Sequence, residues 1–246
     1  MVFPLYDDNP RHGPAVVMWA LVVVNVAIFL FQNQLNDRDQ FLFILRYGLI
    51  PSDLFGSPFR EIPNLISSSF LHGSPLHLVS NMFFLYVFGD NVENRLGHFG
   101  FLGFYLFGSI IAGLVHANFA SSSFVPMVGA SGAVSAVLGA YIFLFPRRKV
   151  LTLITPLFVP WLVLRLIARV PRFFLPWLPA WIFIGYWALI QTIKATNMLM
   201  QGSTGSAGGI AWWAHVGGFG IGLITVVIFS VFRNTRPPIR KTIERD

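Results

Sequence analysis

Long apolar runs constrain the fold of this chain more than any other feature of its sequence. Six of them occur, over about residues 15–31, 76–92, 100–117, 131–145, 179–195 and 210–232. A helix of about 20 apolar residues crosses the roughly 30 Å hydrocarbon core of a bilayer. Charged residues make up only 11% of the chain, whereas a soluble domain carries roughly 25%. The sequence therefore predicts an all-α polytopic membrane protein, with six transmembrane helices in one domain over residues 1–246 and its core over about 62–232.

The positions of the basic residues predict how these helices are oriented. Loops on the cytoplasmic side of a membrane carry an excess of Lys and Arg. The chain has 17 Lys and Arg residues. If the N-terminus is inside, only four of them lie outside: Arg38, Arg46, Arg60 and Lys194. We therefore expect cytoplasmic tails at both ends, an N-terminal one over residues 1–14 and a basic C-terminal one over 233–246. The net charge of +7 is then an orientation signal in the lipid bilayer, and no nucleic-acid partner is expected.

Two connections between the apolar runs need their own interpretation. Residues 150–172 are apolar, but they contain three prolines, which break helices from within. Arg165 and Arg169 would also be costly at the centre of a bilayer. We interpret this segment as interfacial or re-entrant, with a seventh transmembrane helix as the alternative. Residues 33–75 mix aromatic, apolar and charged side chains, which is typical of an ordered loop in the outer membrane interface.

A few polar residues occur inside the apolar runs, where each is expensive and calls for a reason. His77 and Asn81 open the second run, Ser131 opens the fourth, and His215 lies about five residues into the sixth. The fourth run is about 15 residues long, which makes roughly 22 Å of helix. It is too short to cross the membrane, so Ser131 is expected below the outer surface, at about the depth of His215.

This combination of residues favours nucleophilic chemistry. A serine hydroxyl becomes a good nucleophile when an adjacent base takes its proton, and His215 can act as that base for Ser131. Fixed hydrogen-bond donors must stabilise the oxyanion that forms, and the candidates are Asn81, His77 and the backbone N–H of Ser131. We find no carboxylate at this depth, so the sequence predicts a Ser-His dyad. The chain has no Cys and no metal-ligand spacing, so neither a metal nor a cofactor is expected.

The same residues also have structural interpretations. Small residues at four-residue spacing let membrane helices approach closely, and we expect this of Gly132, Gly218 and Gly222. Ser135 lies one turn below Ser131 and is interpreted as a packing residue. The other histidines, His72, His98 and His116, lie near the ends of the runs or in loops, where we expect them to meet water.

With these residues, the sequence resembles the rhomboid family of intramembrane serine proteases. The segment GASG resembles the nucleophile motif of the family, which implies Ser131 as nucleophile with Gly129 as its partner glycine. The segment AHVGGFGIG resembles the motif of the general base, His215, with Gly218 and Gly222 packing its helix on the fourth one. The segment HLVSN resembles the motif that supplies His77 and Asn81 as oxyanion donors.

The resemblance has further implications. The segment ENRLG resembles a family motif in which Glu93 and Arg95 are structural. In some members an aromatic ring four residues after the nucleophile stacks on the histidine; here that position is Ser135, so His215 must be held in another way. The family resemblance implies cleavage of transmembrane protein substrates in or near their membrane segments. The alternatives are a non-catalytic rhomboid-like protein that binds membrane helices and a small-solute transporter.

Overall fold

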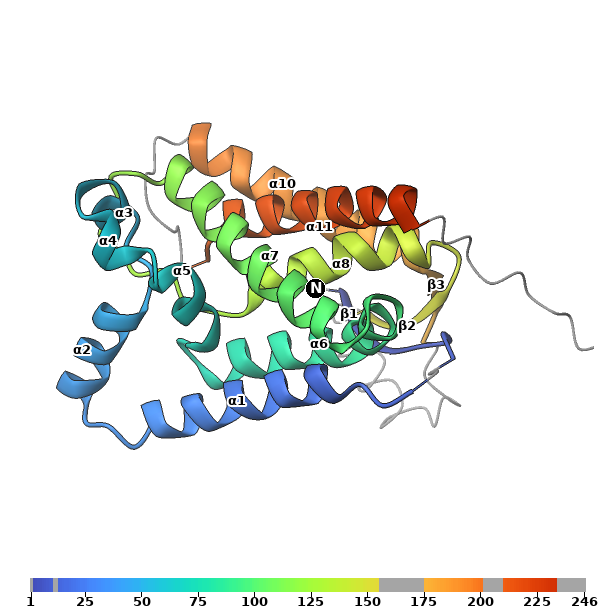
Figure 1. Ribbon diagram of the computed structural model, residues 1–246, viewed down its shortest axis with the longest axis horizontal. Helices are drawn as coiled ribbons and strands as arrows, with labels where there is room; N and C mark the ends of the chain where they lie inside the picture. Colours follow the sequence, from blue (N-terminus) through green and yellow to red (C-terminus); the bar gives the residue numbers. More distant parts are fainter. Residues whose placement is uncertain (1, 11–12, 155–174, 201–209, 234–246) are drawn as a thin grey trace, which may run out of the picture.

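Six long helices pack together in the computed structural model, which describes residues 2–10, 13–154, 175–200 and 210–233 (Figure 1). They are α1 (Val16–Gln32), α6 (Pro75–Leu96), α7 (His98–Phe119), α8 (Ser131–Leu144), α10 (Ala180–Met200) and α11 (Trp212–Arg233). Each coincides with one of the six apolar runs, so the predicted helices are confirmed as helices. By length and composition, two stretches in the described part of the chain could cross a membrane, His98–Phe119 and Trp212–Val231, while Val16–Gln32 and Ser131–Leu144 are apolar but shorter.

Local signals define where α6 begins and ends. Ser74 is its N-cap, and the Ser74 hydroxyl oxygen accepts a hydrogen bond of 3.2 Å from the backbone N–H of His77. Pro75 occupies the first helical position, where its missing N–H costs nothing. The helix ends at Gly97, whose φ of +77° favours glycine, and α7 begins at the next residue. The start of α6, which carries His77 and Asn81, is therefore fixed by the sequence around Ser74.

Helix α8 lies at the centre of the bundle and packs against α6, α7, α10 and α11. Its contact with α11 is made by backbone atoms. A Cβ atom added to Gly222 would lie 2.1 Å from the carbonyl oxygen of Ala136, and one added to Gly139 would lie 2.2 Å from that of Phe219. No side chain can be accommodated at such distances, so these glycines allow the two helix axes to approach closely.

Four short helices and a 3₁₀ turn connect α1 to α6 at one end of the bundle (Figure 1). They are α2 (Asp37–Tyr47), α3 (Pro51–Gly56), α4 (Pro58–Glu61), α5 (Asn64–Ser67) and η1 (Ser68–Phe70). Large apolar side chains point outward from them, including Phe41 and Phe59, which are 60% and 94% exposed. Such side chains suit the outer membrane interface, which is where we expect this connection to lie.

A three-stranded antiparallel sheet lies at the opposite end of the bundle (Figure 1). It comprises β1 (Val2–Asp7), β2 (Lys149–Ile154) and β3 (Trp177–Pro179) in that order, with Phe3 opposite Leu153 and Val150 opposite Leu178. The prediction of an all-α fold is therefore wrong at this end. The alternative of a seventh transmembrane helix is wrong over 150–154, which form part of β2. The interfacial position of the segment stays a prediction, and residues 155–172 lie outside the described residues.

The strand β1 is attached to the helices by a buried carboxylate, because Asp7 is only 3% exposed. The Tyr141 hydroxyl of α8 and the Asn91 side-chain amide of α6 donate hydrogen bonds of 2.5 and 2.9 Å to Asp7 Oδ2. Charge-assisted hydrogen bonds are about twice as strong as neutral ones. Part of the segment expected as an N-terminal tail is thus an ordered strand.

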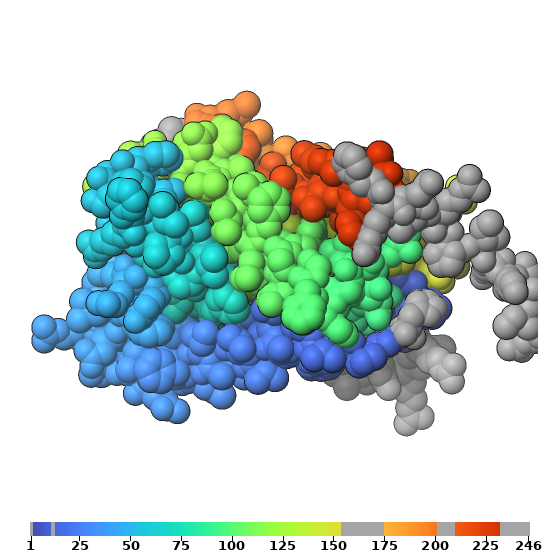
Figure 2. Space-filling model, in the orientation of Figure 1, coloured from blue at the N-terminus to red at the C-terminus, as the bar shows by residue number. Residues whose placement is uncertain are grey.

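A second buried carboxylate fixes the start of α1. Glu93 is 1% exposed, and its two oxygens accept hydrogen bonds of 2.9 and 2.7 Å from the backbone N–H groups of Val17 and Met18. These N–H groups are in the first turn of α1, where helices leave donors unpaired and favour negative charge. Arg95 lies in the last turn of α6. Glu93 thereby holds α1 against the bundle. Figure 2 shows α1 (blue) along one side of the molecule.

We predict that Glu93→Ala lowers the Tm of the protein in detergent micelles by several degrees. The substitution leaves two helix N–H groups without their acceptors and removes a charge at a helix terminus, an interaction worth up to about 2 kcal/mol when partly buried. Thermal unfolding of the purified variant measures the effect. Asp37→Ala is the control, because this carboxylate is in the first turn of α2 but exposed, and a Tm equally low in both variants would contradict the capping role of Glu93.

Candidate active site

The N-terminal ends of α6, α8 and α11 lie on the same side of the molecule, toward the short helices α2–α5 (Figure 1). The four side chains to which the sequence assigned chemistry are all close to these ends. His77 and Asn81 are in the first two turns of α6, Ser131 is the first residue of α8, and His215 is the fourth residue of α11. The three helices run in the same direction, so the structure brings these residues to one end of the bundle.

Small residues determine how α8 and α11, which carry Ser131 and His215, pack against each other. A Cβ atom on Gly218 would lie 2.1 Å from the carbonyl oxygen of Gly132, and one on Gly132 would lie 3.8 Å from the Cβ atom of Ala214. Gly132 follows Ser131 and Ala214 precedes His215, so the two candidate residues are sequence neighbours of residues that lie against each other. In the part of the chain that the structure describes, no hydrogen bond links Ser131 to His215; such bonds are often formed only once substrate is bound.

Gly129 brings the loop before α8 against the start of α6. Its φ is +123°, which only glycine adopts without strain, and its N–H donates a 2.9 Å hydrogen bond to the carbonyl oxygen of Ser68. A Cβ atom here would lie 2.5 Å from His77 Cε1 and 3.6 Å from Asn81 Nδ2. The two proposed side-chain donors therefore lie directly against the backbone two residues before Ser131.

The start of α8 supplies further donors at the same place. Ala130 is its N-cap and forms no side-chain capping bond. The first N–H groups of a helix have no acceptor within the helix, and the helix dipole adds partial positive charge at this end. The backbone N–H of Ser131 belongs to this group, so the site can hold a small anion or a carbonyl oxygen that develops negative charge.

His72 is a site residue that the sequence analysis misplaced. We expected it to meet water, but it is 2% exposed, and its Nε2 atom lies 3.1 Å from Asn81 Nδ2. Burial, and secondarily the neighbouring His77, lowers its pKa to about 3, so the ring is neutral and can accept a hydrogen bond. Gln32 of α1 holds the His72 backbone, since its Oε1 accepts a 3.2 Å hydrogen bond from the His72 N–H.

The other two histidines in question differ from each other. His116, near the end of α7, is 1% exposed, so the expectation that it meets water is also wrong. His98 is half exposed and its Nδ1 atom lies 2.5 Å from Glu93 Oε1. Within the described residues, no group of three or more His, Cys, Asp or Glu side chains could hold a metal ion.

Gln191 of α10 is a second residue that the sequence analysis did not identify. Its Oε1 atom lies 2.9 Å from His215 Nδ1, and the side chain is 8% exposed. The available signal was the cost of a glutamine in the middle of an apolar run, because a buried amide without a partner costs several kcal/mol. A glutamine is not a nucleophile or a base, so this signal alone does not indicate a role in the proposed chemistry.

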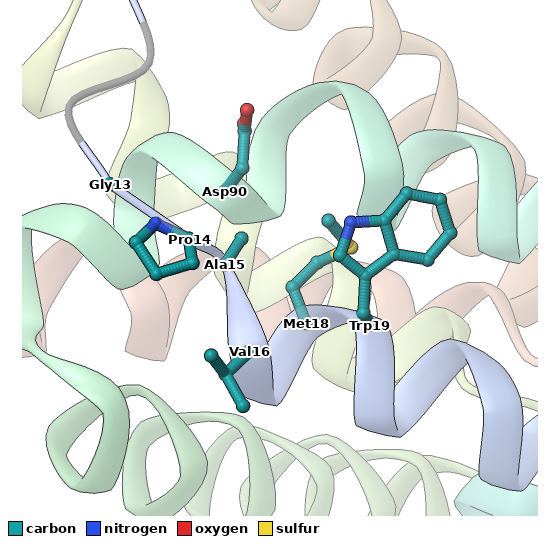
Figure 3. Close-up of a pocket in the computed structure, with 7 residues that line it drawn as sticks. All are labelled: Gly13, Pro14, Ala15, Val16, Met18, Trp19 and Asp90. Carbon is teal, nitrogen blue, oxygen red and sulfur yellow. The ribbon is translucent and has the colours of Figure 1, made fainter.

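A surface pocket at the N-terminal end of α1 is separate from these residues (Figure 3). Met18 and Trp19 line it from α1, and Asp90 lines it from α6. Asp90 follows Asn81 by nine residues, which places it about 13 Å farther along the helix. The pocket belongs to the end of the bundle where Glu93 holds α1.

Comparison with known proteins finds one family and several relatives. The model of the Rhomboid domain matches residues 60–232. The mitochondrial Rhomboid protein 1 of Saccharomyces cerevisiae is 35% identical over 160 residues, which cover 63% of this chain and 42% of that protein. The Rhomboid protease GlpG of Klebsiella pneumoniae is 28% identical over 146 residues, covering 59% and 49% of the two chains. The matched region spans less than half the length of each of these relatives.

We predict that Gly129→Ala displaces His77 and lowers stability by about 1–3 kcal/mol, the usual cost of a residue forced into such a conformation. The shift of the His77 ring resonances in 15N-labelled protein measures the displacement, and thermal unfolding measures the loss of stability. Gly103→Ala is the matched control, because a Cβ atom there meets nothing within 4 Å. Unchanged His77 resonances in Gly129→Ala would show that the loop does not position this side chain.

Proposed function

This chain belongs to the rhomboid family, and from that premise we propose that it is an intramembrane serine endopeptidase. Its substrates are transmembrane or membrane-proximal segments of other membrane proteins. The observation that carries the proposal is the close contact of α8 with α11, where Gly218 lies against the carbonyl oxygen of Gly132. This contact supports the proposal because Gly132 follows Ser131 directly and Gly218 lies one turn after His215.

In the proposed reaction, His215 accepts the proton of Ser131 as the serine Oγ attacks the carbonyl carbon of the scissile peptide bond. The negative charge on the carbonyl oxygen of the tetrahedral intermediate is stabilised by Asn81, His77 and the backbone N–H of Ser131. One such donor is worth roughly 10²–10³ in rate. His215 then gives the proton to the leaving amine, and water hydrolyses the acyl-enzyme by the same steps in reverse order.

The membrane arrangement is part of the proposal. Rhomboid family members are integral membrane proteins, and we place all six long helices across the bilayer, with both termini in the cytoplasm and the site toward the outer side. The basic residues Arg147, Arg148 and Lys149 precede and open β2, so the sheet then lies on the cytoplasmic side, as the distribution of positive charge requires. A substrate helix must unwind locally before its backbone can reach Ser131.

The first alternative is a non-catalytic rhomboid-like protein that binds membrane helices. It is compatible with the same glycine-mediated contact of α8 with α11, which does not by itself require a reaction at Ser131. A small-solute transporter has no comparable support, since buried polar groups in transporters typically lie between helices that are broken in two matching places. Both alternatives predict that the protein leaves a bound membrane helix intact.

We predict that Ser131→Ala and His215→Ala each reduce cleavage of a labelled transmembrane substrate by about 10³-fold or more, since either loss leaves no activated nucleophile. Purified protein in detergent micelles, with quantified cleavage products, provides the measurement. Ser135→Ala is the matched control, because it removes a hydroxyl one turn away on the same helix and should keep the rate within a few-fold. Wild-type rates in either of the first two variants would rule out the proposed dyad.

A further inference from the structure

Gln191 is a buried polar residue in α10 that directly follows the largely apolar first half of this helix. The side chain is 8% exposed, and its Oε1 atom is 2.9 Å from His215 Nδ1 on α11. The two helices pack against each other. Burying an amide is favourable only if it forms hydrogen bonds, and the bond to His215 meets that requirement for the carbonyl end of Gln191.

The surroundings of the His215 ring show where it is held. Trp187, one turn before Gln191 on α10, lies with its ring centroid 6.0 Å from that of His215. Trp212, one turn earlier on α11, lies at 5.9 Å in an edge-to-face arrangement. On α8, the Ser135 hydroxyl donates a 2.5 Å hydrogen bond to the Ser131 carbonyl oxygen. Helix α10 therefore supplies the polar contact of the His215 ring, and the ring faces two tryptophans.

The contact decides which ring nitrogen of His215 carries the proton. A neutral imidazole has one N–H donor and one lone pair, and a glutamine Oε1 atom can only accept. The bond therefore requires a proton on Nδ1, which leaves the Nε2 lone pair available to take the proton of a hydroxyl. The opposite orientation of the amide, with its NH₂ donating to Nδ1, would put the proton on Nε2 and disable the ring as a base for that atom.

We propose that Gln191 is a positioning residue that holds His215 in the Nδ1–H form and fixes the plane of its ring. The proposal rests on the proposed function, in which Nε2 of His215 accepts the Ser131 proton. Gln191 touches neither substrate nor reacting atoms and acts only through His215. A neutral amide can take this role in a buried site because, unlike a carboxylate, it brings no additional charge into the bilayer.

The first test reads the tautomer without any catalysis. Full-length protein carrying Ser131→Ala and 15N-labelled histidine is studied in micelles, and two-bond 15N–1H correlations identify the protonated nitrogen of each ring. Comparison with a His215→Ala sample assigns the His215 signals. We expect Nδ1–H when Gln191 is present, a loss of that preference in Gln191→Leu, and its recovery in Gln191→Glu, whose carboxylate also accepts. An Nε2–H ring with Gln191 present, or no change in Gln191→Leu, would overturn the proposal.

The second test is kinetic and uses protein with Ser131 intact. Gln191→Leu should lower kcat by at least about 10-fold, with KM nearly unchanged, and a histidine locked in the wrong tautomer can cost up to about 10⁴-fold. Gln191→Glu should recover much of kcat. Thr192→Val is the matched control, because the exposed Thr192 is the next residue and its hydroxyl donates a hydrogen bond to the Ala188 carbonyl oxygen of its own helix.

The two claims fail in different ways. If Ser131→Ala and His215→Ala retain cleavage, the proposed function is wrong, while the NMR result still decides the role of Gln191. If those variants are inactive but Gln191→Leu keeps both its kcat and its Nδ1–H signal, the role of Gln191 alone is wrong. If Gln191→Leu does not fold, two other results decide the role of Gln191. They are the tautomer of His215 in the Ser131→Ala protein and whether Gln191→Glu keeps that tautomer.

Discussion

The contact between α8 and α11 is the interaction on which the rest of the site depends. Apolar burial gives two helices little reason to associate in a membrane, so their packing relies on close approach of backbone and small side chains. The Cβ positions of Gly218 and Gly222 would lie 2.1 Å from carbonyl oxygens of Gly132 and Ala136. Any side chain at these positions would push the helices apart, and Ser131 would move away from His215.

The two ends of the bundle have different physical roles. At one end, the buried carboxylates of Asp7 and Glu93 join a strand and a helix start to the core through charge-assisted hydrogen bonds. At the other end, single hydrogen bonds between uncharged side chains join His72 to Asn81 and Gln191 to His215. The proposed dyad belongs to this second end.

Much of this arrangement could be predicted from the sequence because membrane helices can be identified from their apolar composition. All six helices coincide with apolar runs, and polar residues within such runs are few enough to be examined singly. Pairing of β1 with β2 was missed because Val2 and Ile154 are far apart in sequence, and no local pattern indicates the partner of a strand. His72 was misplaced because its contacts with Gln32 of α1 and Asn81 of α6 exist only in the folded chain.

Gln191 illustrates a different limit. Its cost in an apolar helix was visible, but its purpose depends on which helix faces His215, and that follows from the packing of α10 on α11. Sequence patterns identify reactive side chains more easily than they identify the residues that orient them. An orienting residue needs only a single hydrogen-bonding atom. The crossing of the bilayer by all six helices remains a prediction, supported by composition and by family membership.

The most direct test of the central claim is to ask which serine is nucleophilic and whether His215 makes it so. Purified protein would be treated with a serine-directed fluorophosphonate, and mass spectrometry of its peptides would locate and quantify the label. The account predicts modification of Ser131, none of Ser135, and loss of the Ser131 modification in His215→Ala. Labelling of Ser135, or equal labelling of Ser131 with and without His215, would contradict it.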